Sequence, residues 1–342
     1  MGPGGNAPGG PPMIARRLAL LMALVLLPPA GVAQDKAPAA TEPNPLSAVM
    51  QVRARILPDA RSRETLGTRR EGSGVLVREG YVLTIGYLVI EAEAIEVTGA
   101  DGKSVPATLA GYDHASGFGL LRLLAPLDGR PLPLGDSGKV QERDRAIVAS
   151  FGGPERVSPV YVVSRRPFSG SWEYLLESAI FTYPPVPEWS GAALINASGQ
   201  LLGIGSLIVG DSTGLGLQAP GNMFVPADLL APIVEDLIAS GRPKGPARPW
   251  LGMNTEELRG RLLVTRVSPG GPADRAGVRE GDLLVGVGAE DVTSLADFYR
   301  KLWGRGPAGV EVPLRVLQGR EVRELKAQSI DRVEYFRAKP SY

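Results

Sequence analysis

Short apolar runs separated by turn residues recur along most of this chain and restrict what it can fold into. From about residue 50 to residue 225, these runs alternate with Gly, Pro, Asp and Asn. The clearest are Gly74–Val77, Tyr81–Ile85, Ala94–Val97, Ala146–Ser150, Val160–Val163 and Leu201–Leu207. Such spacing is typical of an all-β sandwich or barrel. We therefore predict a mainly β fold for this part of the chain.

The C-terminal part divides at a linker. Pro226–Ser240 carries apolar residues at helical spacing, so we expect it to form the last helix of the first domain. Residues 242–249 are rich in Pro and Gly and are predicted to connect two domains. A chain of 342 residues has room for about two. We place the first at 49–241 and the second at 250–332, followed by a tail at 333–342.

The N-terminus has the three parts of a secretory signal. Arg16 and Arg17 precede the apolar run Leu18–Leu27, and the small residues Gly31–Ala33 follow it. The apolar run is too short to span a bilayer, so we predict a cleaved signal peptide over residues 1–33. The arginine pair leaves two export routes open, general secretion and the twin-arginine route. The expected location is the bacterial periplasm.

Composition excludes several other classes of function. The chain has 37 basic and 36 acidic residues, a balance that provides no field to select nucleic acid or a membrane surface. It has no cysteine, so it can form no disulfide, no cysteine-linked lipid anchor and no cysteine metal site. We expect no cofactor and no metal. Residues 34–48 are rich in Ala, Pro and Glu and are predicted to be a flexible linker. The start codon could be Met1 or Met13.

Several motifs in the first domain occur in the order known from one protease family. They are Gly72–Val77, Gly80–Thr84, Asp113–Leu121, Leu134–Ser137 and Glu188–Leu194. Together they resemble the landmarks of the HtrA (Deg) serine proteases, and several landmarks in order are far more specific than any one alone. The resemblance implies a trypsin-like double six-stranded β-barrel with the reactive cleft between the barrels.

Two of the three catalytic positions of that family are substituted here. Ser190 keeps the position of the nucleophile, but Tyr87 stands in place of the histidine base and Gly117 in place of the orienting aspartate. A serine hydroxyl is a poor nucleophile near neutral pH unless a base takes its proton and a third group orients that base. The flanking residues keep the pattern without a gap. Ser190 is therefore interpreted as a small residue kept at a tight turn.

Other side chains are poor candidates for the missing base. The usual pKa of tyrosine is about 10, so Tyr87 is better suited to donate a hydrogen bond or to fill space. His114 is the only histidine, and we interpret it as a solvated loop residue. Lys103 and Lys139 lie in predicted surface turns. Glu188 replaces a glycine of the oxyanion loop, where its carboxylate would oppose the developing negative charge.

The second domain resembles a PDZ domain of the permuted bacterial type. The predicted carboxylate-binding loop is Trp250, Leu251, Gly252 and Met253, whose backbone N–H groups would hold the C-terminal carboxylate of a peptide. Ser294 is a predicted N-cap. A helical stripe that includes Leu295, Phe298 and Tyr299 would wall the peptide groove on one side and pack into the core on the other.

These features favour an HtrA-like periplasmic protein that binds other proteins without cleaving them. Its expected partners are C-terminal or unfolded segments of envelope proteins, an active protease that it regulates, or an envelope complex. Two alternatives stay open, a serine endopeptidase with a rearranged or partner-completed site and a purely structural subunit. The oligomeric state is also open, because the chain has no Phe, Trp or Tyr before Tyr81, whereas the family often trimerises through aromatic residues there.

Overall fold

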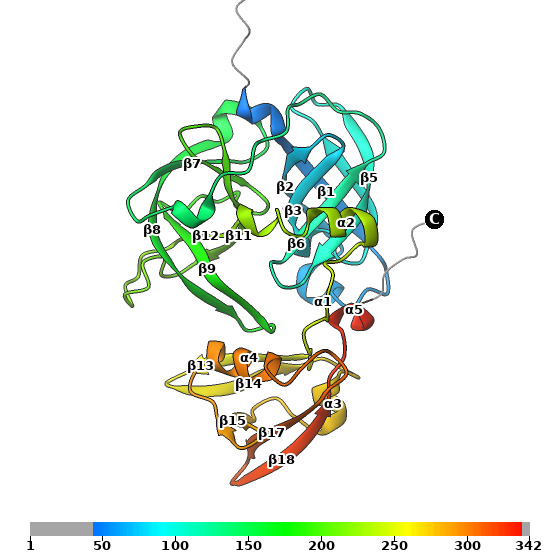
Figure 1. Ribbon diagram of the computed structural model, residues 1–342, viewed down its shortest axis with the longest axis vertical. Coiled ribbons are helices and arrows are strands. Elements are labelled where there is room, and N and C mark those ends of the chain that lie inside the picture. The colour runs from blue at the N-terminus through cyan, green and yellow to red at the C-terminus, as the bar shows by residue number, and fades with distance from the viewer. Residues whose placement is uncertain (1–43, 337–342) are drawn as a thin grey trace, which may run out of the picture. The chain divides into compact units, whose positions relative to one another are not determined.

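Six strands close into a first β-barrel in the order β1-β2-β3-β6-β5-β4. The computed structural model describes residues 44–336, and Figure 1 traces them from blue to red. The strands are β1 (Val49–Ile56), β2 (Arg69–Arg78), β3 (Tyr81–Ile85), β4 (Ala92–Thr98), β5 (Ser104–Asp113) and β6 (Phe118–Leu123). In β1 the side chains of Val52 and Ala54 are buried and those of Arg53 and Arg55 are exposed, which is the alternation of a strand with one face in a core.

Six further strands close a second barrel in the order β10-β11-β12-β9-β8-β7. They are β7 (Arg145–Ala149), β8 (Val157–Gly170), β9 (Tyr174–Tyr183), β10 (Ala193–Ile195), β11 (Leu201–Val209) and β12 (Gly221–Pro226). One apolar cluster joins the two barrels, with Leu83 and Phe118 from the first and Phe181 and Ile195 from the second. The predicted pair of six-stranded barrels is confirmed.

The helix expected over Pro226–Ser240 is shorter than predicted. The chain forms a 3-10 turn, η5 (Ala227–Leu229), and the helix α2 begins only at Val234 and ends at Ser240. Pro232 lies between them, and proline inside a helix removes a backbone donor and collides with the preceding turn. Helix α2 packs on β5, where a β-carbon at Gly111 would lie 2.7 Å from the carbonyl oxygen of Leu237.

Short helices occupy the connections of the first domain. They are η1 (Pro45–Ala48), α1 (Arg63–Leu66), η2 (Gly86–Leu88), η3 (Ser137–Lys139) and η4 (Gly153–Arg156). The turn η1 falls within the predicted flexible linker, and its Ala48 is buried. The predicted signal peptide lies outside the described residues. No helix within residues 44–336 is long and apolar enough to cross a membrane.

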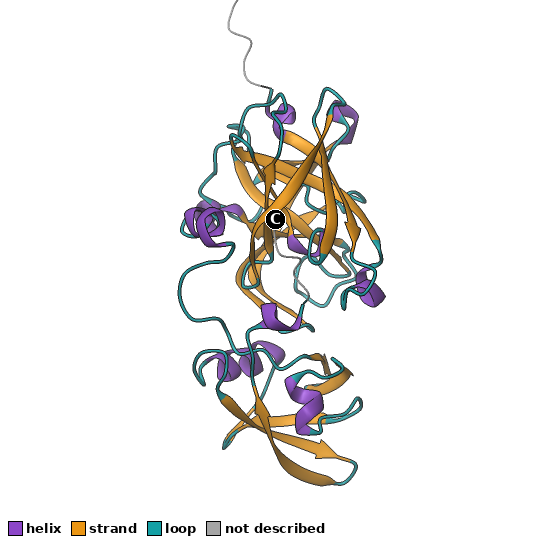
Figure 2. Cartoon of the chain, turned by 90° about the vertical axis from the view of Figure 1, so that its right-hand side faces the viewer, coloured by secondary structure: helices purple, strands orange, loops and turns teal. Residues whose placement is uncertain are grey.

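The C-terminal part is a sheet in the order β13-β14-β15-β17-β18, with β16 paired to β15. Its elements are β13 (Met253–Leu258), β14 (Arg261–Val267), α3 (Pro272–Ala276), β15 (Leu283–Val287), β16 (Glu290–Asp291), α4 (Leu295–Trp303), β17 (Glu311–Gln318), β18 (Glu321–Gln328) and α5 (Arg332–Tyr335). Figure 2 distinguishes these strands and helices by colour.

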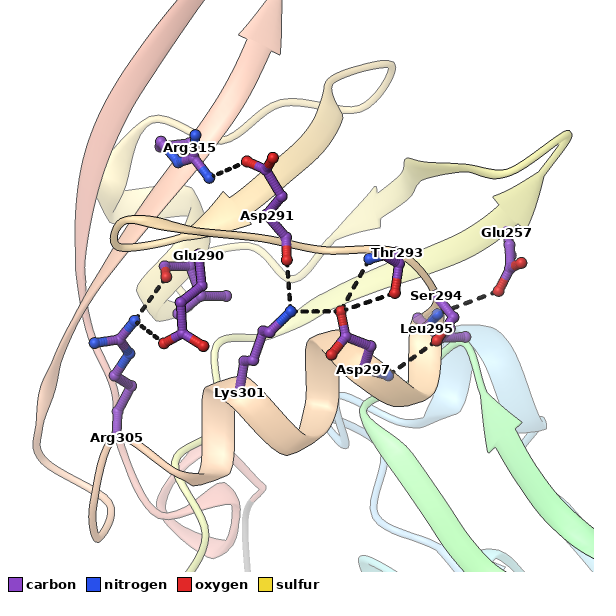
Figure 3. A network of polar contacts seen from close by, with 11 residues as sticks. Glu257, Glu290, Asp291, Thr293, Ser294, Leu295, Asp297, Lys301, Arg305 and Arg315 are labelled. Atoms are coloured by element: carbon purple, nitrogen blue, oxygen red, sulfur yellow. Dashed lines mark hydrogen bonds and ion pairs between the residues drawn. The ribbon is translucent and has the colours of Figure 1, made fainter.

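Helix α4 begins at the predicted cap. The Ser294 hydroxyl accepts a hydrogen bond from the Asp297 N–H at 3.1 Å, and the Asp297 carboxylate accepts one from the Thr293 N–H at 2.9 Å. Lys301 lies one turn later and pairs with Asp297 at 2.7 Å (Figure 3). Leu295 and three further apolar side chains of α4 are buried, so this stripe packs into the core.

Candidate functional site

Ser190 lies in a tight turn that leads into β10 of the second barrel. The Ser73 N–H donates to the Ser190 carbonyl at 2.8 Å, and the Gly191 N–H donates to the Gly205 carbonyl at 2.9 Å. Gly191 has φ 72°, and a β-carbon there would lie 1.9 Å from the carbonyl oxygen of Ser73. Only glycine fits such an approach at positive φ. The turn thus fixes the Ser190 hydroxyl beside the first barrel.

Tyr87 reaches this hydroxyl from the first barrel. It lies in η2, directly after β3, and its Oη is 2.8 Å from Ser190 Oγ. The same phenol donates to the Ser206 carbonyl at 2.9 Å. A phenol has one proton and a carbonyl can only accept, so the Ser190 hydroxyl is the donor toward Tyr87. The Ser190 hydroxyl thus donates to the oxygen of a phenol.

Burial makes this phenol harder to ionise. It raises the pKa of Tyr87 to about 12, although the hydrogen bonds to Ser190 and Trp189 act against the rise. Near neutral pH the phenol therefore stays protonated. A protonated phenol that already donates elsewhere cannot remove a proton from serine.

Gly117, the predicted orienting position, lies in a loop held by local hydrogen bonds. Gly117 has φ 79°. Its carbonyl accepts a hydrogen bond at 2.7 Å from the N–H of Gly86, the residue that precedes Tyr87. Gly117 has no side chain to orient a base. The nearby Asp113 carboxylate accepts bonds from the Ser116 N–H at 2.9 Å and the Ser116 hydroxyl at 2.6 Å. Asp113 thus stabilises its own loop.

His114 is packed, contrary to the interpretation of a solvated loop residue. Its ring centroid lies 4.4 Å from that of Tyr112 and 6.2 Å from that of Phe336. Burial, with the nearby Arg332 charge, lowers the pKa of His114 to about 3. An imidazole with so low a pKa is a very weak base. His114 lines a pocket with Arg332 and residues of the linker, and Ser190 is not among its lining residues.

Glu188 points its carboxylate at a cation. Its side chain forms an ion pair with Arg156, and both are about half exposed. The Ser150 hydroxyl donates to the Glu188 carbonyl at 2.7 Å. The negative charge of Glu188, predicted beside the oxyanion position, is therefore partly compensated by Arg156. The sequence alone did not indicate this ion pair.

The predicted carboxylate-binding loop holds a carboxylate from the same chain. The N–H groups of Gly252 and Met253 donate to Glu173 Oε1 at 2.7 and 3.1 Å, and the Leu251 N–H donates to Oε2 at 2.9 Å. Trp250, the first residue of the predicted loop, pairs through its backbone with Ile330. Burial raises the pKa of the Glu173 carboxyl, while the three amides and Arg332 act against that rise.

Helix α4 contacts the same turn. The Tyr299 hydroxyl donates to the Gly170 carbonyl at 2.6 Å and accepts from the Glu173 N–H at 3.1 Å. Leu295 and Phe298 lie in the core of the C-terminal sheet. Neither Glu173 nor Ser206 was expected at a site, because no local pattern marks a residue whose partner is about 80 to 120 positions away.

Two family models match these two parts of the chain. A family model described as a trypsin-like peptidase domain matches residues 72–204, and one described as a PDZ domain matches residues 263–318. The chain thus carries a trypsin-like domain followed by a PDZ domain.

Among curated proteins, this chain is similar to periplasmic proteases. It is 30% identical over 274 residues to the periplasmic pH-dependent serine endoprotease DegQ of Escherichia coli K12, covering 75% of this chain and 58% of DegQ. It is 28% identical over 272 residues to a probable periplasmic serine protease do/HhoA-like of Haemophilus influenzae, covering 75% and 57%. The chain therefore spans little more than half the length of these relatives.

Solved structures support the fold. The HtrA-type protease AlgW with a decapeptide superposes with a TM-score of 0.51 at 22% identity, covering 86% of this chain and 97% of that one. At this identity the likeness concerns the fold alone.

Proposed function

We propose that this chain, which joins a trypsin-like domain to a PDZ domain as HtrA-type proteases do, binds protein C-termini in the periplasm without hydrolysing peptide bonds. The observation that carries the proposal is the 2.8 Å hydrogen bond between Ser190 Oγ and Tyr87 Oη. Acyl transfer needs a base at that point and a group that orients it. The chain offers a phenol that donates elsewhere, and a glycine in place of the orienter.

The competing proposal, an endopeptidase with a rearranged site, would need another base. The phenolate of Tyr87 could act only as the pH approaches about 12, and His114 has a pKa of about 3. Proton transfer is most effective when the pKa of the base is close to the working pH. The pKa of Tyr87 lies far above neutral pH, and the pKa of His114 lies far below it.

A fluorophosphonate probe should not label the purified full chain, and unfolded casein should stay uncleaved. The reason is that the Ser190 hydroxyl has no base to remove its proton. The measurement is gel fluorescence after incubation from pH 6 to pH 9, with Ser190→Ala as the control and trypsin as the positive reference. Labelling of the natural chain that disappears in Ser190→Ala would refute inactivity.

The PDZ loop is the proposed binding site. Its amides already donate three hydrogen bonds to a carboxylate, and this supports recognition of a peptide terminus there. Bonds to a charged acceptor are roughly twice as strong as neutral ones. A peptide with an apolar last residue and a free carboxylate should therefore bind the full chain about 10-fold more tightly than its amide, a difference of about 1.4 kcal/mol.

Gly252→Val should abolish this preference for the free carboxylate. Gly252 has φ 80°, and a β-carbon there would lie 2.8 Å from the Trp250 ring, so a side chain must displace the loop. The measurement is calorimetric titration with both peptides. Gly260→Val is the matched control, since Gly260 has φ 71° and open space around its would-be β-carbon. Equal affinity for acid and amide in the natural chain would exclude a carboxylate site.

A further inference from the structure

The turn between β8 and β9 has an unusual residue at its end. The two strands pair down to Gly170 and Tyr174, which leaves Ser171, Trp172 and Glu173 as a three-residue turn. Three-residue hairpin turns place their last residue in the left-handed region, where glycine is favoured. Glu173 occupies that place at φ 57°. A residue kept in a disfavoured backbone conformation points to a role for its side chain.

The side chain of Glu173 is buried in the PDZ domain. Only 5% of the residue is exposed, and both carboxylate oxygens accept hydrogen bonds from the loop Leu251–Met253. Consecutive N–H groups that converge on one carboxylate are the arrangement by which a PDZ domain holds the end of a peptide.

The backbone of the same turn lies where a bound peptide would lie. The Thr255 N–H, in β13, donates to the Ser171 carbonyl at 2.9 Å. The Tyr299 hydroxyl of α4 donates to the Gly170 carbonyl and accepts from the Glu173 N–H. A peptide that adds to a PDZ sheet makes its main-chain bonds to that strand and lies against that helix.

Two contacts farther along β9 extend the junction. Leu175 is 5% exposed and belongs to the apolar core cluster of the PDZ domain. Glu177 forms a two-pronged ion pair with Arg300 of α4, with distances of 3.1 and 2.6 Å. The hairpin thus combines a carboxylate, a main-chain bond and an apolar side chain, the same elements that a C-terminal peptide offers.

We propose that Glu173 is an internal substitute for a peptide's C-terminal carboxylate, so that the β8–β9 hairpin and a protein C-terminus compete for the loop Leu251–Met253. This inference rests on the proposed peptide binding. A ligand that binds only the open loop has an apparent affinity reduced by the fraction of open molecules. Because the hairpin is tethered, its effective concentration at the loop is high, and a peptide must displace it. Displacement of the hairpin also frees the β8–β9 turn. This turn belongs to the second barrel, the same barrel that carries Ser190.

The test compares the full chain with Glu173→Gly and Glu173→Gln. Glycine removes the carboxylate and suits φ 57°, so it keeps the turn, and glutamine keeps the length of the side chain without its charge. Glu324→Gln, on the exposed part of β18, is the matched control for the loss of one negative charge. Thermal unfolding verifies that each variant is folded.

The first measurement needs no ligand. Amide hydrogen exchange at residues 251–253, followed by NMR, should be at least 10-fold faster in both Glu173 variants than in the natural chain and Glu324→Gln. Equal exchange in all four proteins would overturn the docked carboxylate.

The second measurement titrates a fluorescent decapeptide that ends in valine with a free carboxylate. Its affinity should rise at least 10-fold in both Glu173 variants. Equal binding to the natural chain and the variants would overturn the competition and leave the proposed peptide binding intact. No binding to any protein, with exchange accelerated in the variants, would refute the proposed peptide binding and with it the competition, while the internal contact would stand.

Discussion

The full chain with Tyr87→His, Gly117→Asp and Glu188→Gly should cleave unfolded casein, and the variant that keeps Glu188 should be slower by about 100- to 1000-fold. Histidine at position 87 would take the place of the phenol that is 2.8 Å from Ser190 Oγ. Aspartate tolerates the positive φ of Gly117 better than most residues. Glycine at 188 removes the carboxylate and gives the oxyanion loop its backbone freedom.

The control for this gain of activity is the same triple variant with Ser190→Ala, which should be inactive. Loss of the exposed ion pair between Glu188 and Arg156 should change stability little. Initial rates on labelled casein measure the outcome. Full turnover by the double variant that keeps Glu188 would show that this residue does not impair the oxyanion loop, and an inactive but folded triple variant would contradict the assigned positions.

Gly191→Ala should be among the most destabilising single substitutions in the first domain, by about 2–5 kcal/mol. A positive φ costs a residue with a side chain roughly 1–2 kcal/mol. Overpacking typically adds about 1–3 kcal/mol, and here the new β-carbon would lie 1.9 Å from the Ser73 carbonyl oxygen. The measurement is urea unfolding of the full chain followed by fluorescence, with the midpoint compared at equal slope.

Gly199→Ala separates the two contributions. Gly199 has nearly the same φ, 73°, but nothing lies within 4 Å of its would-be β-carbon. It should therefore lose only the conformational part, roughly 1–2 kcal/mol. If both variants lost the same stability, the close approach at Ser73 would not contribute.

The sequence by itself determined the elements whose causes are local. Tyr81–Ile85 was predicted as a strand and is β3 with the same bounds. The Ser294 cap and the stripe of α4 were also predicted, because capping and helical periodicity depend on residues three or four positions apart. The exception is Pro226–Ser240, for which apolar periodicity predicts one helix over the whole segment. Pro232 has no N–H to donate within a helix, and α2 begins only after it, at Val234.

Only the tertiary structure decided what the site residues contact. The resemblance placed Tyr87 and Ser190 in one cleft, but the second bond of Tyr87, to Ser206, fixes the direction of the Ser190 proton. Likewise, the PDZ loop was predicted, whereas its occupation by Glu173 was not. These contacts join residues about 80 to 120 positions apart, and they form because closed barrels and a tight hairpin bring distant backbone segments together. No local pattern in the sequence carries that information, since neighbouring residues fix the shape of a turn and the packed fold fixes what the turn meets.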